Sequence, residues 1–382
     1  MSRTPLLITI LYVCSITISC QKKQQTETTN FKAFRIETGG VEKHFFEQIE
    51  NLSLIILPET DSTLISGIGQ AKISNGFLYI VDWQAKTLIK LTEEGEIKNV
   101  LHKPGKGPYE YRMIDDFEVT ESEIITLDAN RRQLQYWTKN LKFKKSQRIP
   151  FQASGFDITS DGFIFDNNYT AINDSLKYNI VFTNKALKIT RTELPFDNQR
   201  SLLIATNSIQ KLGNTFTYRP AFVDTIYQLD DTNSKAIYKL DFGEKWKFND
   251  GYKTDQEFMQ VYGNPNAEEM VLWVEASIDK KKIFIRSTNS DMVSNGTLID
   301  LSTGKQIALD LSVKEQSPQY AVRILGNNYE GKSLMQLDPF QFEELLTHIP
   351  ESEIIVLGDQ SISDARNTEN PKLLLFSFKP VD

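Results

Sequence analysis

Short runs of apolar residues alternate with polar turns along most of the chain, and this pattern predicts β-strands. Phe77 to Asp82, Glu123 to Asp128 and Gly162 to Asp166 each hold β-branched or aromatic residues and end in aspartate. A second apolar segment precedes each of these runs, and a further one begins six residues after Asp82 and again six residues after Asp128. The chain therefore repeats a unit of several strands.

The period of this repeat is typical of a β-propeller. Asp82 and Asp128 lie 46 residues apart, and a third and a fourth strand follow each of them. Four strands in about 40–50 residues make one propeller blade. Looser units continue to residue 378 and bring the total to six. We predict an all-β fold, a six-bladed β-propeller with four-stranded antiparallel blades.

One predicted strand stands apart from the six units. Asn51 to Pro58 is strongly apolar but precedes the first blade. We expect it to supply the missing strand of the last blade, so that an N-terminal strand closes the ring and no sheet edge stays open. The last blade is interrupted by a predicted helix, Pro339 to His348. The propeller is thus expected to span residues 45–382.

The first residues of the chain have the pattern of an export signal. Arg3 precedes an apolar stretch without charges that runs to Ser19. This stretch is too short to cross about 30 Å of hydrocarbon at 1.5 Å per residue, so a cleaved segment over residues 1–19 is favoured over a membrane-spanning helix.

The signal ends at Cys20, and the order Thr17-Ile18-Ser19-Cys20 resembles the lipobox of bacterial lipoproteins. This resemblance implies that Cys20 is acylated and becomes the mature N-terminus. The alternative is a plain secretory signal with an incidental cysteine. The polar residues that follow predict a flexible tether over residues 20–44. Lys22 and Lys23 favour an outer-membrane anchor that faces the periplasm.

Charge and cysteine content exclude several kinds of protein. The chain has 382 residues, with 43 Lys and Arg against 50 Asp and Glu and a net charge of −7. Such a balance argues against a nucleic-acid partner. The two cysteines, Cys14 and Cys20, both lie in the first twenty residues, so the remaining chain holds neither a disulfide framework nor a cysteine-ligated zinc.

Four segments carry a family resemblance. They are Leu57-Pro58-Glu59-Thr60, Tyr79-Ile80-Val81-Asp82, Gly105-Lys106-Gly107-Pro108-Tyr109-Glu110-Tyr111 and Asp224-Thr225-Ile226-Tyr227. The chain resembles, over residues 45 to 380, the six-bladed β-propeller lipoproteins of gut-type Gram-negative bacteria, which are NHL-like in fold. Tyr109 departs from that pattern, because the family usually has glycine there. The resemblance implies a cell-envelope location but no particular activity.

The glycine-containing segment between the first two blades is the leading candidate for a ligand-binding site. It combines aromatic rings for stacking with charges for orientation, which suits a sugar or a peptide. A shaped inter-blade turn without a ligand is an equally good interpretation. Loops from several blades can meet at one funnel, and convergence of Arg112, Arg131 and Arg219 there would make a carboxylate- or phosphate-binding centre. The alternative is that they are separate, solvated surface arginines. The candidate residues are Gly105, Gly107, Tyr109, Glu110, Tyr111, Arg112, Arg131 and Arg219.

Metal-dependent catalysis is the less favoured alternative. Asp82, Asp128 and Asp166 are candidate calcium ligands, but we prefer Asx turns at these strand ends. The chain has three histidines, His44, His102 and His348, which lie far apart in the sequence and do not predict a three-histidine zinc site. No nucleophile motif occurs in the predicted propeller. We therefore expect no catalytic residues and no cofactor, with calcium as the alternative.

These features predict a lipid-anchored binding or protein-interaction module of the cell envelope. Its expected partners are the membrane, through the N-terminal anchor, and a peptide, a glycan fragment or an envelope protein. The alternative is a calcium-assisted hydrolase or lyase of the lactonase-like propeller type, for which carboxylates on the inner strands would have to surround the metal ion.

Overall fold

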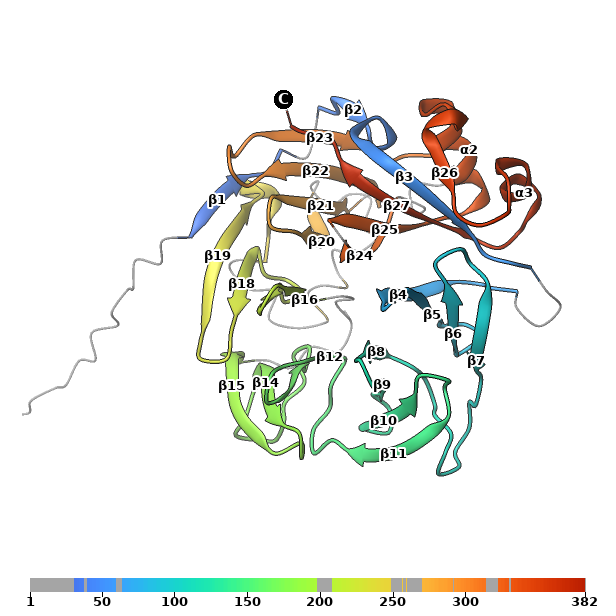
Figure 1. The fold of residues 1–382 in the computed structure, drawn as a ribbon. Coiled ribbons are helices and arrows are strands. Elements are labelled where there is room, and N and C mark those ends of the chain that lie inside the picture. The colour runs from blue at the N-terminus through green and yellow to red at the C-terminus, as the bar shows by residue number, and fades with distance from the viewer. Residues whose placement is uncertain are drawn as a thin grey trace, which may run out of the picture. The chain divides into compact units, whose positions relative to one another are not determined.

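The computed structural model describes one propeller unit within residues 31–381. The described residues are 31–37, 40–59, 64–197, 208–248, 256, 259, 270–290, 292–313, 322–329 and 331–381. The predicted signal peptide, Cys20 and the first part of the predicted tether lie outside the described residues. Six separate sheets form a ring (Figure 1), which confirms the six-bladed β-propeller predicted from the repeat.

The first three blades are regular four-stranded antiparallel sheets. Blade I contains β4 (Ile68–Ser74), β5 (Phe77–Asp82), β6 (Thr87–Thr92) and β7 (Ile97–Leu101). Blade II contains β8 (Asp116–Val119), β9 (Glu123–Asp128), β10 (Gln133–Thr138) and β11 (Phe143–Arg148). Blade III contains β12 (Gly155–Ile158), β13 (Gly162–Asp166), β14 (Tyr178–Asn184) and β15 (Ile189–Pro195).

The next two blades each carry a fifth strand that comes from the N-terminal region. Blade IV contains β16 (Ile209–Leu212), β17 (Thr215–Tyr218), β18 (Thr225–Leu229), β19 (Ser234–Asp241) and β1 (Lys32–Arg35). Blade V contains β20 (Val271–Ile278), β21 (Lys282–Asn289), β22 (Ser294–Asp300), β23 (Gln306–Asp310) and β2 (Lys43–His44). Strands β1 and β2 pair in parallel with β19 and β23.

These two pairings correct the predicted boundary of the tether. The sequence predicts a flexible tether to residue 44, whereas Lys32–Arg35 and Lys43–His44 are hydrogen-bonded to the outer strands of blades IV and V. The polar composition misled the prediction, because an edge strand that faces solvent does not need the alternating apolar pattern of a buried strand. The apolar signal in this segment was Phe34 in β1 and Ile36 just after it, both of which are buried.

Blade VI closes the ring with an N-terminal strand, as predicted. Its members are β24 (Ile324–Tyr329), β25 (Lys332–Leu337), β27 (Lys372–Phe378), β3 (Ile49–Ile56) and β26 (Ile354–Val356). Strand β3 pairs antiparallel with β27, and Leu54 lies opposite Leu374. A fifth strand, β26, adds to β3 in parallel. The closing strand is buried along its last five residues, so it is part of the core.

Helices cover the outer side of blade VI (Figure 1). The structure has α2 (Pro339–His348), α3 (Ile362–Asn367) and the 3-10 helices η1 (Phe45–Gln48), η2 (Gly243–Lys245) and η4 (Glu351–Glu353). Helix α2 begins at the predicted residue, where Asp338 caps it by accepting a hydrogen bond from Gln341 N. No helix among the described residues has the length and apolar character needed to cross a bilayer.

The apolar core lies between neighbouring blades. One cluster joins the closing strand to blade I through Ile55 and Leu78, and another joins blades I and II through Tyr79 and Trp137. Because each strand alternates its faces, one set of side chains packs against the preceding blade and the other against the following blade. The six innermost strands, β4, β8, β12, β16, β20 and β24, are thereby left around the centre of the ring.

Candidate functional site

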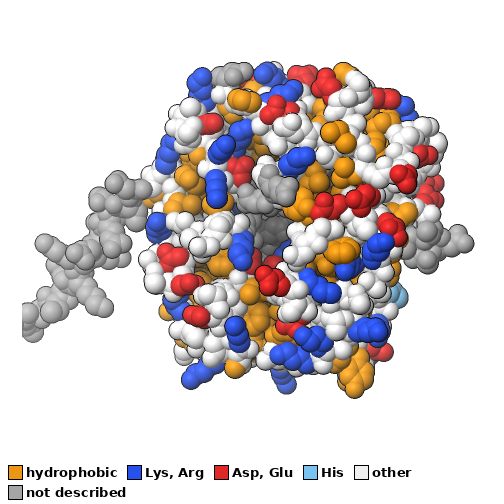
Figure 2. Space-filling view, in the orientation of Figure 1, with side chains coloured by type: hydrophobic (Ala, Val, Ile, Leu, Met, Phe, Trp, Pro, Cys, Tyr) orange, Lys and Arg blue, Asp and Glu red, His pale blue; other side chains and the backbone are white. Residues whose placement is uncertain are grey.

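A cavity of about 550 Å³ lies at the centre of the propeller. All six innermost strands contribute to its wall, for example Lys72 from β4, Glu118 from β8 and Glu275 from β20. Figure 2 shows that charged side chains of both signs surround the middle of this face. The blades are arranged radially around one axis, and each places its innermost strand beside that axis. Residues far apart in the sequence therefore meet there.

The wall formed by blades I to III is acidic. Lys72 forms an ion pair with Glu118, and Asp157 lies close enough to both for its charge to act on them. Asp116 of β8 is not one of the lining residues, but its charge acts on Lys72 and Glu118, and it accepts hydrogen bonds from Phe117 N and Phe156 N, both at 2.8 Å. We call Lys72, Asp116, Glu118 and Asp157 the acidic sector.

Burial changes the protonation of this sector. It raises the pKa of Glu118, and the nearby charge of Asp157 adds to the increase. It also raises the pKa of Asp116 and of Asp157. For Lys72, burial opposes the charged form, but the surrounding carboxylates outweigh it and raise its pKa. The acidic sector therefore contains one positively charged side chain, Lys72, and three carboxyl groups whose charged forms it stabilises.

The opposite wall, on blades IV to VI, is basic. The strand register places Glu275 of β20 directly across from Arg286 of β21, and the two form an ion pair of 3.0 Å. Arg219 and Arg323 also line the cavity; burial lowers the pKa of both, and the charge of nearby Glu275 offsets part of this decrease. We call Arg219, Glu275, Arg286 and Arg323 the basic sector. Three guanidinium groups face one carboxylate, which leaves a net charge of about +2.

Each arginine of the basic sector is held differently. Arg219 donates to three backbone carbonyls, those of Pro220 at 3.1 Å, Val223 at 3.3 Å and Val274. Burial lowers its pKa to about 10, so Arg219 stays positively charged at neutral pH. Among the described residues, Arg323 makes a single long bond of 3.4 Å to Gly69 O, and burial lowers its pKa as well. Most of the donor capacity of Arg323 is therefore available to a ligand.

Two buried donors in this wall have no partner among the described residues. They are Arg286 Nε and Trp246 Nε1, and both side chains line the cavity. A buried polar group without a hydrogen bond costs about 1–3 kcal/mol, so such donors mark places where a ligand or water is bound. Trp273 and Phe222 extend the same wall with aromatic surface.

The predicted glycine loop is stabilised by its own residues. Glu110 accepts a hydrogen bond of 2.6 Å from Gly107 N, and a Cβ atom on Gly105 would lie only 2.0 Å from Glu110 Oε2. Arg131 Nη1 donates to Gly107 O at 3.1 Å and to Glu110 O. The glycines are needed because the glutamate folds back over the loop backbone.

The two tyrosines of this loop have different surroundings. Tyr111 is fully buried, and its hydroxyl group accepts from Lys103 N at 3.1 Å and lies 2.8 Å from Lys86 O and 3.0 Å from Leu101 O. Burial raises the pKa of Tyr111 to about 12. Tyr109 is 60% exposed and meets Phe143 edge to face. Tyr111 therefore fastens the loop between blades I and II, and Tyr109 alone offers a free ring surface.

The predicted meeting of three arginines involves other residues than expected. Arg112 is exposed and Arg131 is bonded to the glycine loop, and neither lines the central cavity. Arg219 does line it. Its arginine neighbours there are Arg286 and Arg323. Arginines from different blades do line the cavity, but the predicted Arg112 and Arg131 are not among them.

The three candidate calcium ligands act in turns. Asp82, Asp128 and Asp166 each accept hydrogen bonds from backbone N–H groups two or three residues further along the chain, at 2.7 to 3.0 Å. This confirms the Asx turns predicted at the strand ends. A calcium ion would have to displace these bonds. Across the described residues, none of the three belongs to a group of His, Cys, Asp or Glu close enough to hold a metal ion.

Most residues of the cavity wall are not among those predicted from the sequence. Asp157, Glu275 and Arg323 were not singled out, although all three lie in or beside strands that the repeat predicted. A charged residue in the first strand of a unit was the signal, because that strand faces the axis of a propeller and a charge there is buried.

A ring of six blades around a charged central cavity defines this protein as a β-propeller with a charged axial cavity. A model of the family described as a domain of unknown function, DUF4934, matches residues 33–377. The chain belongs to this family. A search of curated protein sequences finds no match.

Solved structures share the fold at low sequence identity. A putative exported protein from Bacteroides fragilis NCTC 9343 is 17% identical, with 92% of this chain and 100% of that chain covered and a TM-score of 0.71. A member of the DUF4221 family from Bacteroides vulgatus ATCC 8482 is 10% identical, with coverages of 87% and 98% and a TM-score of 0.52. These similarities concern the fold and carry no activity over to this chain.

Proposed function

We propose that the protein is an exported binding module whose central cavity takes up a small ligand with a carboxylate group. The observation that carries this proposal is the basic sector, in which Arg219, Arg286 and Arg323 surround one carboxylate. Guanidinium groups bind carboxylates through paired charge-assisted hydrogen bonds. The unpartnered Arg286 Nε and Trp246 Nε1 provide further donors in the same wall.

A short peptide fits both walls of the cavity better than a neutral sugar does. Its C-terminal carboxylate would face the basic sector, and its amino group would face Glu118 and Asp157 on the opposite wall. Trp273 and Phe222 offer aromatic surface for apolar side chains. A glycan fragment or an envelope protein would use the same opening, but a neutral glycan would leave three arginines with Glu275 as their one carboxylate in this wall.

Calorimetric titration with trialanine, and with its N-acetylated and C-amidated forms, tests this proposal. We expect trialanine to bind, amidation to weaken binding at least tenfold and acetylation to weaken it less. Arg323→Gln should reduce affinity about tenfold, because it removes a charge-assisted contact. Arg148→Gln, on the exposed outer strand of blade II, is the matched control. Equal binding of trialanine and its amide would contradict the carboxylate site.

We further propose that the protein is anchored by acylation of Cys20 to the outer membrane, on the side that faces the periplasm. The apolar signal with Cys20 at its end supports this location, and so does the fold shared with a putative exported protein. Several acyl chains hold a protein stably at a bilayer. Labelled palmitate should enter the wild type and not Cys20→Ala, and labelling that survives this substitution would rule out the anchor.

A further inference from the structure

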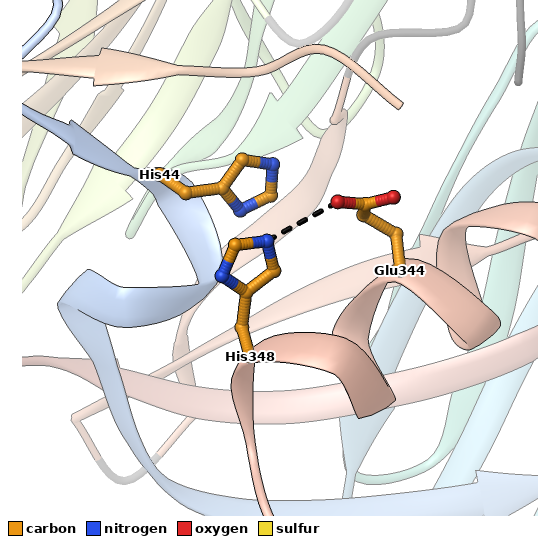
Figure 3. Close-up of side chains that lie close together, drawn as sticks. All are labelled: His44, Glu344 and His348. Carbon is orange, nitrogen blue, oxygen red and sulfur yellow. Dashed lines mark hydrogen bonds and ion pairs between the residues drawn. The ribbon is translucent and has the colours of Figure 1, made fainter. Parts of the chain in front are cut away.

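A second cluster of chemically active side chains lies on the outer side of blade VI, away from the cavity. His44 ends β2 and caps η1, whereas Glu344 and His348 lie one turn apart on α2. Residues four apart on a helix share a face, so α2 presents both side chains to the N-terminal segment. Figure 3 shows the Glu344 carboxylate beside the edges of the two histidine rings.

The three side chains are within reach of one metal ion. One ligand atom from each of His44, Glu344 and His348 lies within 4.8 Å of the other two. The two imidazole rings are parallel, with their centroids 4.0 Å apart and an angle of 1° between the planes. Within the described part of the chain, no other group of three such side chains is this close.

The hydrogen bonds of His44 leave one ring nitrogen basic. The carbonyl of Ser312 lies 3.1 Å from Nε2 and can only accept, so the proton is on Nε2. Nδ1 then carries the lone pair, and it receives a long bond of 3.3 Å from Phe46 N. A backbone carbonyl bound to the second nitrogen is the usual arrangement for a histidine that ligates a metal.

His348 is flanked by two carboxylates. Its Nε2 lies 3.1 Å from Glu344 Oε1, and its Nδ1 lies 3.2 Å from Glu47 Oε1. If Nδ1 donates to Glu47, Nε2 is the ligating nitrogen and points to the same place as the Glu344 carboxylate. Carboxylate, histidine and metal in line form a common outer-shell arrangement, in which the carboxylate fixes the ring and increases its basicity.

Glu344 provides the charge that would attract a cation. Its side chain is 7% exposed, and His348 is the polar partner of its carboxylate among the described residues. A buried carboxylate needs a positive partner, since burial of an isolated charge is costly. A divalent ion bound between Glu344 and the two rings would supply it.

We propose that His44, Glu344 and His348 bind a divalent transition-metal ion of the zinc type. Two imidazole nitrogens and one carboxylate form a ligand set that zinc uses, with the fourth position left to water. Bonds of about 2.0–2.2 Å in tetrahedral geometry place ligand atoms about 3.4 Å apart, so the site must contract slightly and the parallel rings must rotate. The 3.3 Å bond from Phe46 N to His44 is released in this step.

The position of the site gives the metal a structural effect. His44 immediately precedes η1 and the closing strand β3, whereas Glu344 and His348 belong to the helix between β25 and β26 of the same blade. An ion bound to both segments joins the N-terminal part of the chain to blade VI. Because it binds the folded ring and not the separated segments, it stabilises the closed propeller.

Cobalt and zinc binding to tag-free, chelator-treated protein tests the site. We expect one Co²⁺ per molecule with the intense visible absorption of a four-coordinate site, displacement of Co²⁺ by Zn²⁺, and a higher melting temperature with Zn²⁺. His348→Ala and His44→Ala should each weaken binding at least about tenfold, and Glu47→Gln should weaken it about tenfold. His102→Ala is the matched control, because His102 lies beside Thr87 in blade I.

The melting temperature of each variant without metal separates loss of binding from loss of fold. If a histidine variant is poorly folded, Glu344→Gln, which keeps the shape of the side chain, replaces it in the test. The proposal is overturned if the wild type binds no stoichiometric Co²⁺ or Zn²⁺. It is also overturned if the two histidine variants bind as tightly as His102→Ala.

Discussion

The glycine loop, residues 105–112, and the central cavity contain similar residue types but differ in how far the hydrogen-bonding groups of these residues have partners within the protein. In the loop, Glu110 and Arg131 bond to the loop backbone, and Tyr111 is buried with its hydroxyl group bonded. In the cavity, the part of the chain that the structure describes offers no partner to the buried Arg286 Nε and one long bond to Arg323. The presence of charged and aromatic groups on one loop therefore does not indicate a binding site. Buried hydrogen-bond donors without a partner in the protein are better evidence for one.

The two regions also differ in how the chain brings their residues together. The loop collects its groups within eight consecutive positions. The basic sector draws on three blades, with Arg219, Glu275 and Arg323 spread over more than a hundred residues. Side chains on a local segment can form hydrogen bonds with the backbone of the same segment. Side chains that the closed ring brings together are each held by their own blade, so their donors can remain available to a ligand.

The largest effect is expected from breaking the loop. Tyr111→Phe removes a buried hydroxyl group and leaves Lys103 N without its partner, which should cost about 1–3 kcal/mol of unfolding free energy. Thermal unfolding followed by circular dichroism measures this, with Tyr109→Phe as the exposed control. Binding of trialanine by the folded variant should not change. A loss of binding without a loss of stability would assign the loop to the ligand site.

A smaller effect is expected from the protonation of the acidic sector. The pKa of Glu118 is raised above its ordinary value of 4.5 in the folded state, so the folded protein binds this proton more tightly than the unfolded chain does. Stability from this group is therefore present at low pH and is lost as the pH rises from 4.5 through the raised pKa. Glu118→Gln should reduce that loss by about 1 kcal/mol.

Denaturant unfolding at a series of pH values from 4.5 upward measures this slope. Glu123→Gln is the matched control, because Glu123 pairs with Lys144 between β9 and β11 and does not line the cavity. The control should keep the slope of the wild type. If the unfolding free energies of Glu118→Gln and the wild type fall with pH at the same rate, the pKa of Glu118 is not raised in the folded state.

The repeat could be read from the sequence because it is local. The aspartate at the end of the second strand binds its own turn, so Asp82 and Asp128 mark the period without any knowledge of distant contacts. The closing strand could be predicted because a long apolar strand without neighbours needs an open edge. The pairing of β1 and β2 could not be predicted, since their parallel addition to β19 and β23 depends on which outer strand edges are exposed in the closed ring.

The candidate site was harder to predict for a related reason. Whether Arg219 or Arg131 reaches the axis depends on the position of each residue within its blade and on the twist of the sheet, which a single sequence does not contain. Likewise, His44 and His348 are three hundred residues apart and meet because β3 closes blade VI. Side chains that the closure of a ring brings together are recognised only when the closure itself is known.

The smallest effect is expected from Arg112, and it decides between the two regions most directly. Arg112 is exposed, and its backbone N–H, not its side chain, donates to Asp128 at 2.7 Å. Arg112→Ala should change the unfolding free energy by less than about 0.5 kcal/mol, as is usual for a surface residue. Trialanine affinity should also stay at the wild-type value, whereas Arg323→Gln lowers it. The reverse result, in which Arg112→Ala weakens trialanine binding and Arg323→Gln does not, would move the binding site from the cavity to the loop, because Arg323 lines the cavity and Arg112 does not.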